Sequence, residues 1–294
     1  MTRRLVGAAI ALLACLACLR SGPTTDSRPT AAGIDHVALR ASDPPQTADF
    51  YARLFGPDAK SPPRAIVANP GSVPSPHYWV KAGAGYFAIS QASAENGPPA
   101  IDHTCLVFRD ADADAMARLL AGLDRRFEKP SMYSIATDFW SVDPGGNLLQ
   151  LDANPEGYWD RLDELGSARP ATELPSTRGE AVFRTLRIAR VELPATDRAA
   201  SFDYYERLLG REAGSAPDAP LRVGPSQLVL VPPARGETIV VAVAEASPEA
   251  ILARLRENGF EGARSAADPS AIELRDPDGT RLRIVSTSAA RPLP

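Results

Sequence analysis

Residues 34–43 read IDHVALRASD, and the second half of the chain repeats this pattern as IARVELPATD (residues 188–197). With the same offset and no gap, FYARLFG (residues 50–56) aligns with YYERLLG (residues 204–210). Similarity at a fixed offset is typical of chains built from repeated units. The sequence therefore predicts two related halves.

Both halves also end alike, in DPGGNLLQL (residues 143–151) and DPDGTRLRI (residues 276–284). Within each half, a β-type run, an amphipathic helical stretch and further short β-type runs occur twice. In the second unit, for example, the run at 100–108 precedes a helix predicted over 111–123, with Asp110 placed to cap its start. The prediction is an α+β fold made of four βαβββ units.

Residues 1–20 have the pattern of an export signal. A short basic start precedes an apolar run at 5–19, which is shorter than the roughly 20 residues that a membrane-spanning helix needs. Cys15 follows the tripeptide LLA, which resembles the leucine-small-cysteine box of bacterial lipoproteins. We expect Cys15 to be lipidated and the protein to lie in the cell envelope. The alternative, an ordinary signal, predicts a periplasmic or secreted protein, and 21–32 is expected to form a flexible tether.

The composition limits the partners of the protein. The chain has 32 basic and 36 acidic residues and a formal net charge of −4. No clustered basic face is apparent, so we expect no nucleic-acid partner and contact with a membrane only through the lipid anchor. Cys105 is the only cysteine outside the signal region, which excludes a disulfide within the folded part. The composition does not indicate an oligomeric state.

The repeated units resemble the vicinal oxygen chelate superfamily, which includes glyoxalase I, bleomycin-resistance and extradiol-dioxygenase relatives. The resemblance rests on the strand opener IDHVAL (residues 34–39), the helix end FYARLFG and the closing VDPGGNLLQL (residues 142–151), which occur in this order. It implies that the units pair, and that each pair curves into an open, eight-stranded cleft able to hold a divalent metal.

The resemblance divides the chain into two domains of vicinal-oxygen-chelate type. The first, at 33–153, contains two units and the expected metal site. The second, at 186–287, contains the other two units. We expect 154–185 to be a linker and 288–294 to be a tail.

The chain has only three histidines, yet two of them, His36 and His103, follow the same Ile-Asp pair. The resemblance implies that the first strands of paired units lie side by side around the cleft, so these two imidazoles should meet at one point. Imidazole is a good ligand for Fe, Mn, Zn and Ni. We therefore expect His36 and His103 to bind one divalent metal together.

The third expected ligand departs from the family pattern DPxGNxxE, because Gln150 stands where the family has glutamate. An amide oxygen can coordinate a metal, but it brings no charge and does not accept a proton near neutral pH. The alternative is that Asp152, on the same strand face, replaces the carboxylate through a shift of register.

Other residues are candidates to line the cleft. We expect His77, Tyr133 and Trp140 to contact a substrate; the plainer alternatives are a strand-edge histidine and core aromatics. Cys105 shares the strand face of His103, and a buried, inert cysteine is the favoured interpretation over a ligand.

The second half has lost the ligand pattern, since Arg190 aligns with His36 and Arg283 with Gln150. Two arginines repel a cation and could receive an anion. The favoured interpretation is a degenerate, structural domain whose arginines carry ordinary surface charge.

Two functions from different classes remain. The first is a divalent-metal-dependent lyase, isomerase or dioxygenase acting on a small oxygenated metabolite, with no catalytic base identified. The alternative is a metal-free protein that binds or sequesters a small molecule, as bleomycin-resistance relatives do. The histidine pair favours the enzyme, and the missing glutamate favours the binding protein.

Overall fold

The structure is a computed structural model. It describes the following residues: 28–55, 64–67, 76–109, 111–123, 138–153, 181–210, 216, 219–245, 247–266 and 268–286. The predicted signal peptide with Cys15, the tail and Tyr133 lie outside these residues.

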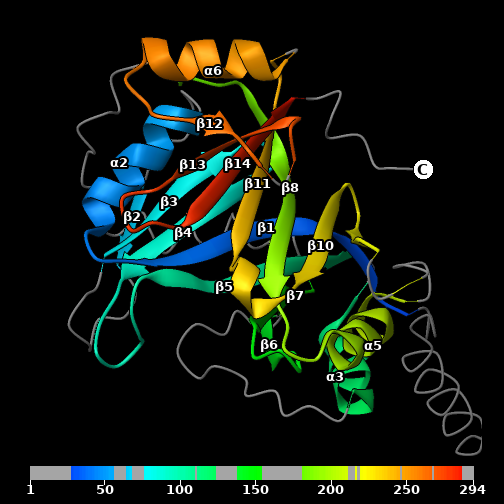
Figure 1. The fold of residues 1–294 in the computed structure, drawn as a ribbon. Coiled ribbons are helices and arrows are strands. Elements are labelled where there is room, and N and C mark those ends of the chain that lie inside the picture. The colour runs from blue at the N-terminus through cyan, green and yellow to red at the C-terminus, as the bar shows by residue number, and fades with distance from the viewer. Residues whose placement is uncertain are drawn as a thin grey trace, which may run out of the picture.

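The first half forms one mixed sheet of seven strands in the order β2-β3-β4-β1-β5-β7-β6 (Figure 1). In its centre β1 and β5 pair antiparallel, and each has a parallel outer neighbour, β4 and β7. The two units of this half therefore meet through their first strands, as predicted. The strands are β1 (Thr30–Ala41), β2 (Arg64–Val67), β3 (Pro76–Ala82), β4 (Gly85–Gln91), β5 (Ala100–Arg109), β6 (Asp138–Val142) and β7 (Leu148–Asp152).

The second half forms a second sheet in the order β12-β13-β14-β11-β8-β10-β9. Its central strands β8 and β11 again pair antiparallel, which confirms the α+β fold of paired units. Within the described residues each sheet has seven strands, not the eight that the resemblance implies. The strands are β8 (Thr185–Pro194), β9 (Leu221–Val223), β10 (Ser226–Val231), β11 (Thr238–Val243), β12 (Ala263–Arg264), β13 (Ala271–Arg275) and β14 (Arg281–Ser286).

Each unit contributes one α-helix after its first strand: α2 (Pro44–Phe55), α3 (Ala113–Gly122), α5 (Arg198–Leu209) and α6 (Pro248–Glu257). The prediction that Asp110, which lies outside the described residues, caps the second of these helices is wrong in position. Helix α3 begins later, and Asp112 caps it by accepting a hydrogen bond of 2.7 Å from the backbone N of Ala115. The apolar stripe is as expected, with Met116 and Leu120 buried.

Helices of the first half lie near helices of the second half. Figure 1 shows α2 near α6 at one end of the molecule and α3 near α5 at the other. The hydroxyl of Tyr51 in α2 donates to Asp276 Oδ2 of the second half, at 3.1 Å. The hydroxyl of Tyr204 in α5 donates to Ser141 Oγ of the first half, at 2.7 Å. Both contacts are buried, so each half completes the packing of the other.

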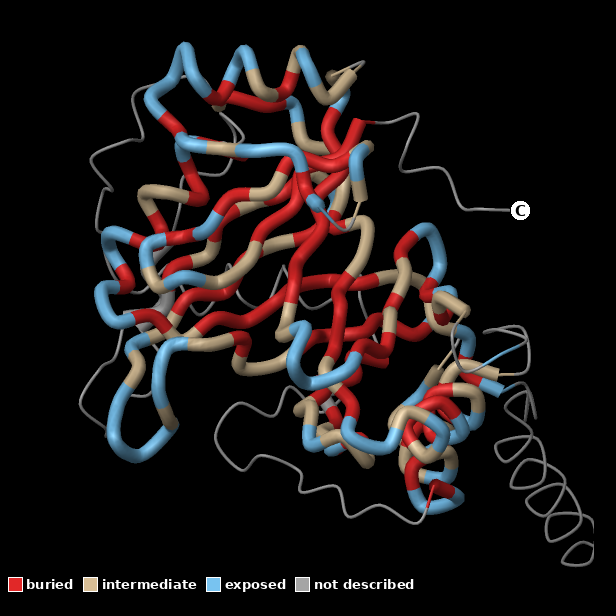
Figure 2. Tube along the Cα trace, viewed as in Figure 1, coloured by how far each residue is buried: buried red, intermediate tan, exposed pale blue. Residues whose placement is uncertain are grey.

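Two glycine turns bring the sheets into close contact. Gly83 has φ 67°, and a Cβ there would lie 2.2 Å from the backbone of Leu186 in β8. Gly224 has φ 56°, and a Cβ there would lie 1.9 Å from the carbonyl oxygen of Ala32 in β1. A side chain fits neither position, so a hairpin of each sheet presses on the first strand of the other. One hydrophobic core joins the halves, seen as buried strands that cross the centre of Figure 2.

Two predicted boundaries need correction. Strand β1 begins at Thr30, inside the predicted tether at 21–32. The end of the predicted linker is packed, because Val182 N and Phe183 N donate to the backbone oxygens of Arg53 and Leu54, each at 2.9 Å. Hydrogen bonds of this kind fix the chain on α2 before β8 begins.

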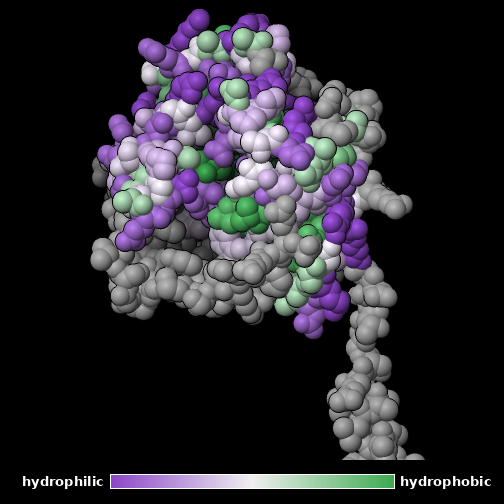
Figure 3. All heavy atoms as spheres, turned by 60° about the horizontal axis from the view of Figure 1, so that its bottom comes forward, coloured by the Kyte–Doolittle hydropathy of each residue, from purple (hydrophilic) through white to green (hydrophobic). Residues whose placement is uncertain are grey.

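The described surface has few apolar features. The face in Figure 3 is mostly hydrophilic, with small hydrophobic patches beside a hollow. Val142, 41% exposed, is the one exposed large hydrophobic residue in the part of the chain that the structure describes. None of the described helices is long and apolar enough to cross a membrane.

Candidate metal centre

Each of the two cleft histidines follows an aspartate that occupies a β-bulge. The register between β1 and β5 shifts so that Asp35 in β1 and Asp102 in β5 have no opposite residue. In a regular strand, neighbouring side chains point to opposite faces. A bulge bends the strand and redirects the side chain. Asp35 and Asp102 therefore reach the rings of His36 and His103 instead of the other face of the sheet.

These aspartates fix the proton on each imidazole. Asp35 Oδ2 lies 2.7 Å from His36 Nδ1, and Asp102 Oδ2 lies 2.8 Å from His103 Nδ1. A carboxylate accepts hydrogen bonds, so each neutral ring carries its proton on Nδ1 and its lone pair on Nε2. An outer carboxylate of this kind orients metal-binding histidines and raises their basicity.

The two Nε2 atoms and the side-chain oxygen of Gln150 converge on one point. His36 Nε2 lies 3.3 Å from His103 Nε2, which lies 3.1 Å from Gln150 Oε1. Three lone pairs so close repel one another unless a cation lies between them. Two ligands at about 2.1 Å from one metal are about 3.0 Å apart at a right angle and about 3.4 Å apart at a tetrahedral angle. The observed distances fit a divalent metal between these three atoms.

Burial supports the neutral form of His103. The side chain of His36 is 1% exposed, and the side chain of His103 is 12% exposed. Burial lowers the pKa of His103 below its usual value, more than the hydrogen bond to Asp102 raises it. Burial acts to raise the pKa of Asp102, but the hydrogen bond from His103 and the charge of Arg40 hold this pKa below its ordinary value.

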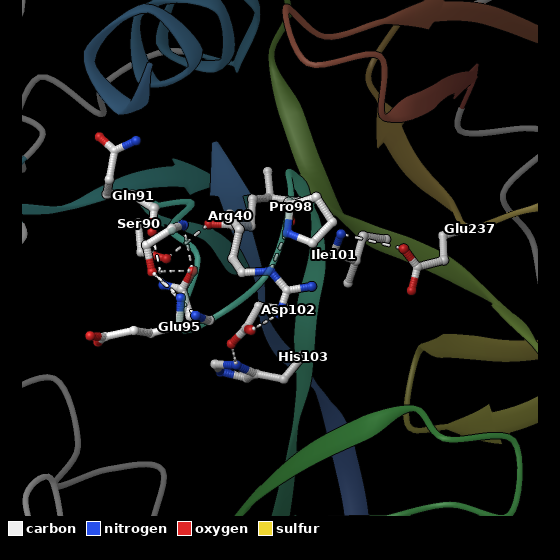
Figure 4. Close-up of polar contacts among 12 residues, drawn as sticks. Arg40, Ser90, Gln91, Glu95, Pro98, Ile101, Asp102, His103 and Glu237 are labelled. Atoms are coloured by element: carbon white, nitrogen blue, oxygen red, sulfur yellow. Dashed lines mark hydrogen bonds and ion pairs between the residues drawn. The ribbon is translucent and has the colours of Figure 1, made fainter. Parts of the chain in front are cut away.

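A residue of the second half, Glu237, contacts the strand that carries Asp102 and His103 (Figure 4). Arg40 Nη1 donates to Asp102 Oδ1 at 2.8 Å, and its Nε donates to the Pro98 oxygen at 3.1 Å. Glu237, which precedes β11, accepts a hydrogen bond of 3.3 Å from the backbone N of Ile101. Burial raises the pKa of Glu237, although Arg40 acts to lower it. A chain of charges thus runs from the second half to the ring of His103.

A tryptophan packs edge-on against each histidine. The ring of Trp79 in β3 lies 5.0 Å from that of His36, and the ring of Trp140 in β6 lies 4.7 Å from that of His103. Trp140 Nε1 is buried and has no hydrogen-bond partner among the residues described. Each histidine ring is therefore flanked by an aromatic ring, and one of the two tryptophans has a buried donor without a partner among the described residues.

The structure brings together three of the predicted site residues, His36, His103 and Gln150, with Trp140 beside them. The register pairs Gln150 with Cys105, so no shift moves Asp152 to the ligand position. His77 lies in β3, but its side chain is outside the described part, as are Tyr133 and Cys15.

Sequence reasoning missed Asp35, Asp102 and Trp79. The signal for the two aspartates was the repeated Ile-Asp-His itself, in which only the histidine was assigned a role. Trp79 follows His77 by two residues on the same strand, so a search along that face would have found it.

The equivalent cleft of the second half holds a buried ion network. Arg283 Nη1 donates to Glu192 Oε1 at 2.8 Å, and its Nε donates to Glu273 Oε2 at 3.0 Å. Arg190 Nη1 lies 3.9 Å from the same oxygen of Glu192. Arg283 and Glu192 are 3% and 2% exposed, so the prediction that the arginines carry ordinary surface charge is wrong for Arg283. Thr238 is the residue equivalent to His103. It lies opposite Glu192, just as His103 lies opposite Ala38.

Comparison with known proteins agrees with this architecture. Residues 33–151 match the model of the glyoxalase/bleomycin resistance protein/dioxygenase superfamily. No curated protein matches the chain significantly.

Solved structures with this fold include dioxygenases and a glyoxalase. The chain is similar to a catechol 2,3-dioxygenase at 12% identity and a TM-score of 0.58, over 90% of each chain. It is similar to the 2,3-dioxygenase LapB of Pseudomonas sp. KL28 at 14% identity and a TM-score of 0.55, over 88% of this chain and 93% of the other. It is also similar to the Mn(II)-bound glyoxalase of Novosphingobium aromaticivorans at 14% identity and a TM-score of 0.55, over 88% of this chain and 83% of the other. Residues 33–151 thus match the glyoxalase/bleomycin resistance protein/dioxygenase superfamily, and the chain as a whole resembles the two-domain vicinal oxygen chelate fold.

Proposed function

We propose that the first domain is a divalent-metal-dependent lyase, isomerase or dioxygenase that acts on a small oxygenated metabolite. Its metal, one of Fe, Mn, Zn or Ni, is held by His36 Nε2, His103 Nε2 and Gln150 Oε1. The observation that carries this proposal is the convergence of these atoms within 3.1 and 3.3 Å, with both Nδ1 atoms bonded to carboxylates. The fold shared with 2,3-dioxygenases and a Mn(II)-bound glyoxalase supports it.

When bound, the metal would polarise adjacent oxygens of a substrate as a Lewis acid. The residues of the chain then have separate tasks. Asp35 and Asp102 keep the histidine lone pairs on Nε2. Trp79 and Trp140 flank the site and reduce the access of water, and Trp140 Nε1 can donate to a substrate oxygen. Gln150 holds no charge, so it positions the metal without serving as a base.

The alternative function is metal-free binding of a small molecule. Gln150 favours it, because two imidazoles and an amide leave the charge of a divalent ion unneutralised. The same aromatic walls would then enclose the ligand. In that case the histidines would contact the ligand directly, with one ring donating through Nε2.

Metal analysis of protein purified without a tag or chelator tests the choice. We expect one equivalent of a divalent metal in the unaltered protein and its loss in His36→Ala and His103→Ala. A matched control is Arg190→Ala at the equivalent position of the second half, which should keep the metal. If all four proteins have the same metal content, the enzyme proposal is wrong and the binding protein is favoured.

We also propose that the protein is exported and lipid-anchored through Cys15. The basic start, the short apolar run and the cysteine box support this location. Fractionation of cells that produce the full chain and Cys15→Ser tests it. The full chain should fractionate with membranes and the variant should not; an intact amino terminus in the cytosol would contradict export.

A further inference from the structure

A third type of ligand lies beside the histidine pair. Cys105 is fully buried and stands directly opposite His36 across β1 and β5. Opposite residues of an antiparallel pair lie on the same face with their Cβ atoms close together. Ligand atoms of Asp35, His36 and Cys105 all lie within 4.8 Å of one another. Two adjacent strands therefore present a carboxylate, an imidazole and a thiol to one small volume.

The two nitrogens of His36 face different neighbours. Nδ1 lies 2.7 Å from Asp35 Oδ2, whereas Nε2 lies 3.3 Å from His103 Nε2. The ring edge at Nδ1 is the edge next to Asp35, a member of the trio with Cys105. The other side belongs to the site with His103 and Gln150.

We propose that Asp35, His36 Nδ1 and Cys105 form a second cation position, selective for a thiophilic divalent ion such as Zn²⁺ or Cd²⁺. Thiolate is the soft ligand that these ions prefer, and a carboxylate with a thiolate brings two negative charges. Such charges balance a divalent ion that is buried away from water, where an unpaired charge is costly. The site of His36, His103 and Gln150 offers no such charge and no sulfur.

The protons balance in a simple way. The thiol of Cys105 loses its proton to solvent when the ion binds, because the thiolate is the ligand. The proton on His36 moves from Nδ1 to Nε2. There the N–H can donate a hydrogen bond to His103 Nε2, which lies 3.3 Å away. A protonated Nε2 has no lone pair for the other site. The two positions therefore exclude each other, and a thiophilic ion displaces the metal of the proposed function.

Titration of the full chain with Cd²⁺ tests the trio, with ultraviolet thiolate-to-cadmium charge-transfer absorption as the signal. We expect this absorption in the unaltered protein and in His103→Ala. One equivalent of it should be absent from Cys105→Ser and from Cys105→Ala; the second variant guards against misfolding caused by a buried hydroxyl. Since Cys15 and Cys18 are also thiols, the difference between proteins is the measured quantity. The same absorption in Cys105→Ala as in the unaltered protein would overturn the proposal.

A displacement experiment separates this inference from the proposed function, with which it shares His36 and Asp35. Protein loaded with Mn²⁺ is mixed with Cd²⁺, and released Mn²⁺ is measured by electron paramagnetic resonance. We expect release from the unaltered protein and retention in Cys105→Ala. Release that is equal in both proteins contradicts the trio. Failure of the unaltered protein to bind Mn²⁺ contradicts the proposed function, and the Cd²⁺ titration still decides the trio.

Discussion

The first and the second cleft occupy equivalent places in two related sheets, but only the second has an ion pair at its centre. In the first, the Nε2 atoms of His36 and His103 and the side-chain oxygen of Gln150 converge, at 3.3 and 3.1 Å. In the second, the guanidinium of Arg283 lies between Glu192 and Glu273. The second cleft thus contains its own cation as part of the chain. The first cleft has the geometry for an ion that must come from solution.

The difference also separates stability from function. A guanidinium fixed by two carboxylates contributes to folding, and its loss leaves the buried Glu192 with only Arg190, at 3.9 Å, as an ion-pair partner among the described residues. The expected ligands of the histidine site, two imidazoles and an amide, include no carboxylate that would be left without a partner when the ion is absent. We therefore expect substitutions in the second cleft to change stability, and those in the first to change metal affinity.

The largest expected effect is in the second cleft. Arg283→Met leaves Glu192 and Glu273 without their shared partner, and breaking a buried ion pair typically costs about 3–5 kcal/mol. Denaturant unfolding, followed by circular dichroism, measures this loss. The control Arg256→Met, on the exposed side of α6, should change stability by less than about 0.5 kcal/mol. A small effect of Arg283→Met would show that the network is not an internal substitute for an ion.

In the first cleft, the carboxylates behind the histidines should set metal affinity. Asp102→Asn removes the charge that holds His103 Nδ1–H, and changes of this type typically weaken metal binding about 10–100-fold. Isothermal titration with Mn²⁺ measures the affinity. Asp114→Asn, exposed in α3, is the matched control and should leave it unchanged. Equal affinities in all three proteins would mean that Asp102 does not act on the metal site.

The sequence predicts features that depend on residues close together in the chain better than features that depend on how distant strands pair. The units and their order are local patterns, so the strands and helices follow from the repeats. The meeting of His36 and His103 follows from the pseudo-symmetry of paired strands. The repeated Ile-Asp-His indicated that Asp35 and Asp102 are equivalent but not what they contact, because a carboxylate next to a histidine on a regular strand points away from it. Only the bulges reverse that direction.

The ion network of the second cleft could not be predicted for a different reason. The alignment of the halves identified Arg190 and Arg283, but their partners do not align with metal ligands. In the first half, Ala38 stands at the position of Glu192. Trp140 stands at the position of Glu273, because it pairs with Gln150 as Glu273 pairs with Arg283. Only the register of three separate strands brings these charges together, and the sequence alone does not contain that register.

A third prediction makes the first cleft more like the second by adding charge. Gln150→Glu places a carboxylate beside the two imidazoles and should tighten divalent-metal binding about tenfold, equal to about 1.4 kcal/mol. Gln46→Glu, exposed at the start of α2, adds the same charge elsewhere and should have no effect. Titration calorimetry of both variants gives the comparison. Weaker binding by Gln150→Glu would show that the metal does not lie at this side chain.

The smallest expected effect is a shift in pH dependence. Protonation of an imidazole competes with the metal, so affinity falls as the pH drops through the pKa of the ring. Burial lowers the pKa of His103 below its usual value, so this loss should begin below about pH 6.5, the usual value for histidine. Affinities measured from neutral to acid pH test the sign. An affinity already lost above the usual value would contradict a buried, neutral His103.

The most direct test of the central claim is the position of the metal itself. Crystals of the protein soaked in Mn²⁺ give an anomalous difference peak that locates the ion. The account predicts one strong peak in the first cleft, about 2.0–2.2 Å from His36 Nε2, His103 Nε2 and Gln150 Oε1, as expected for metal ligands. It predicts none in the second cleft, where Arg283 already lies between the carboxylates. Absence of the peak between the histidines, or an equal peak in the second cleft, would contradict it.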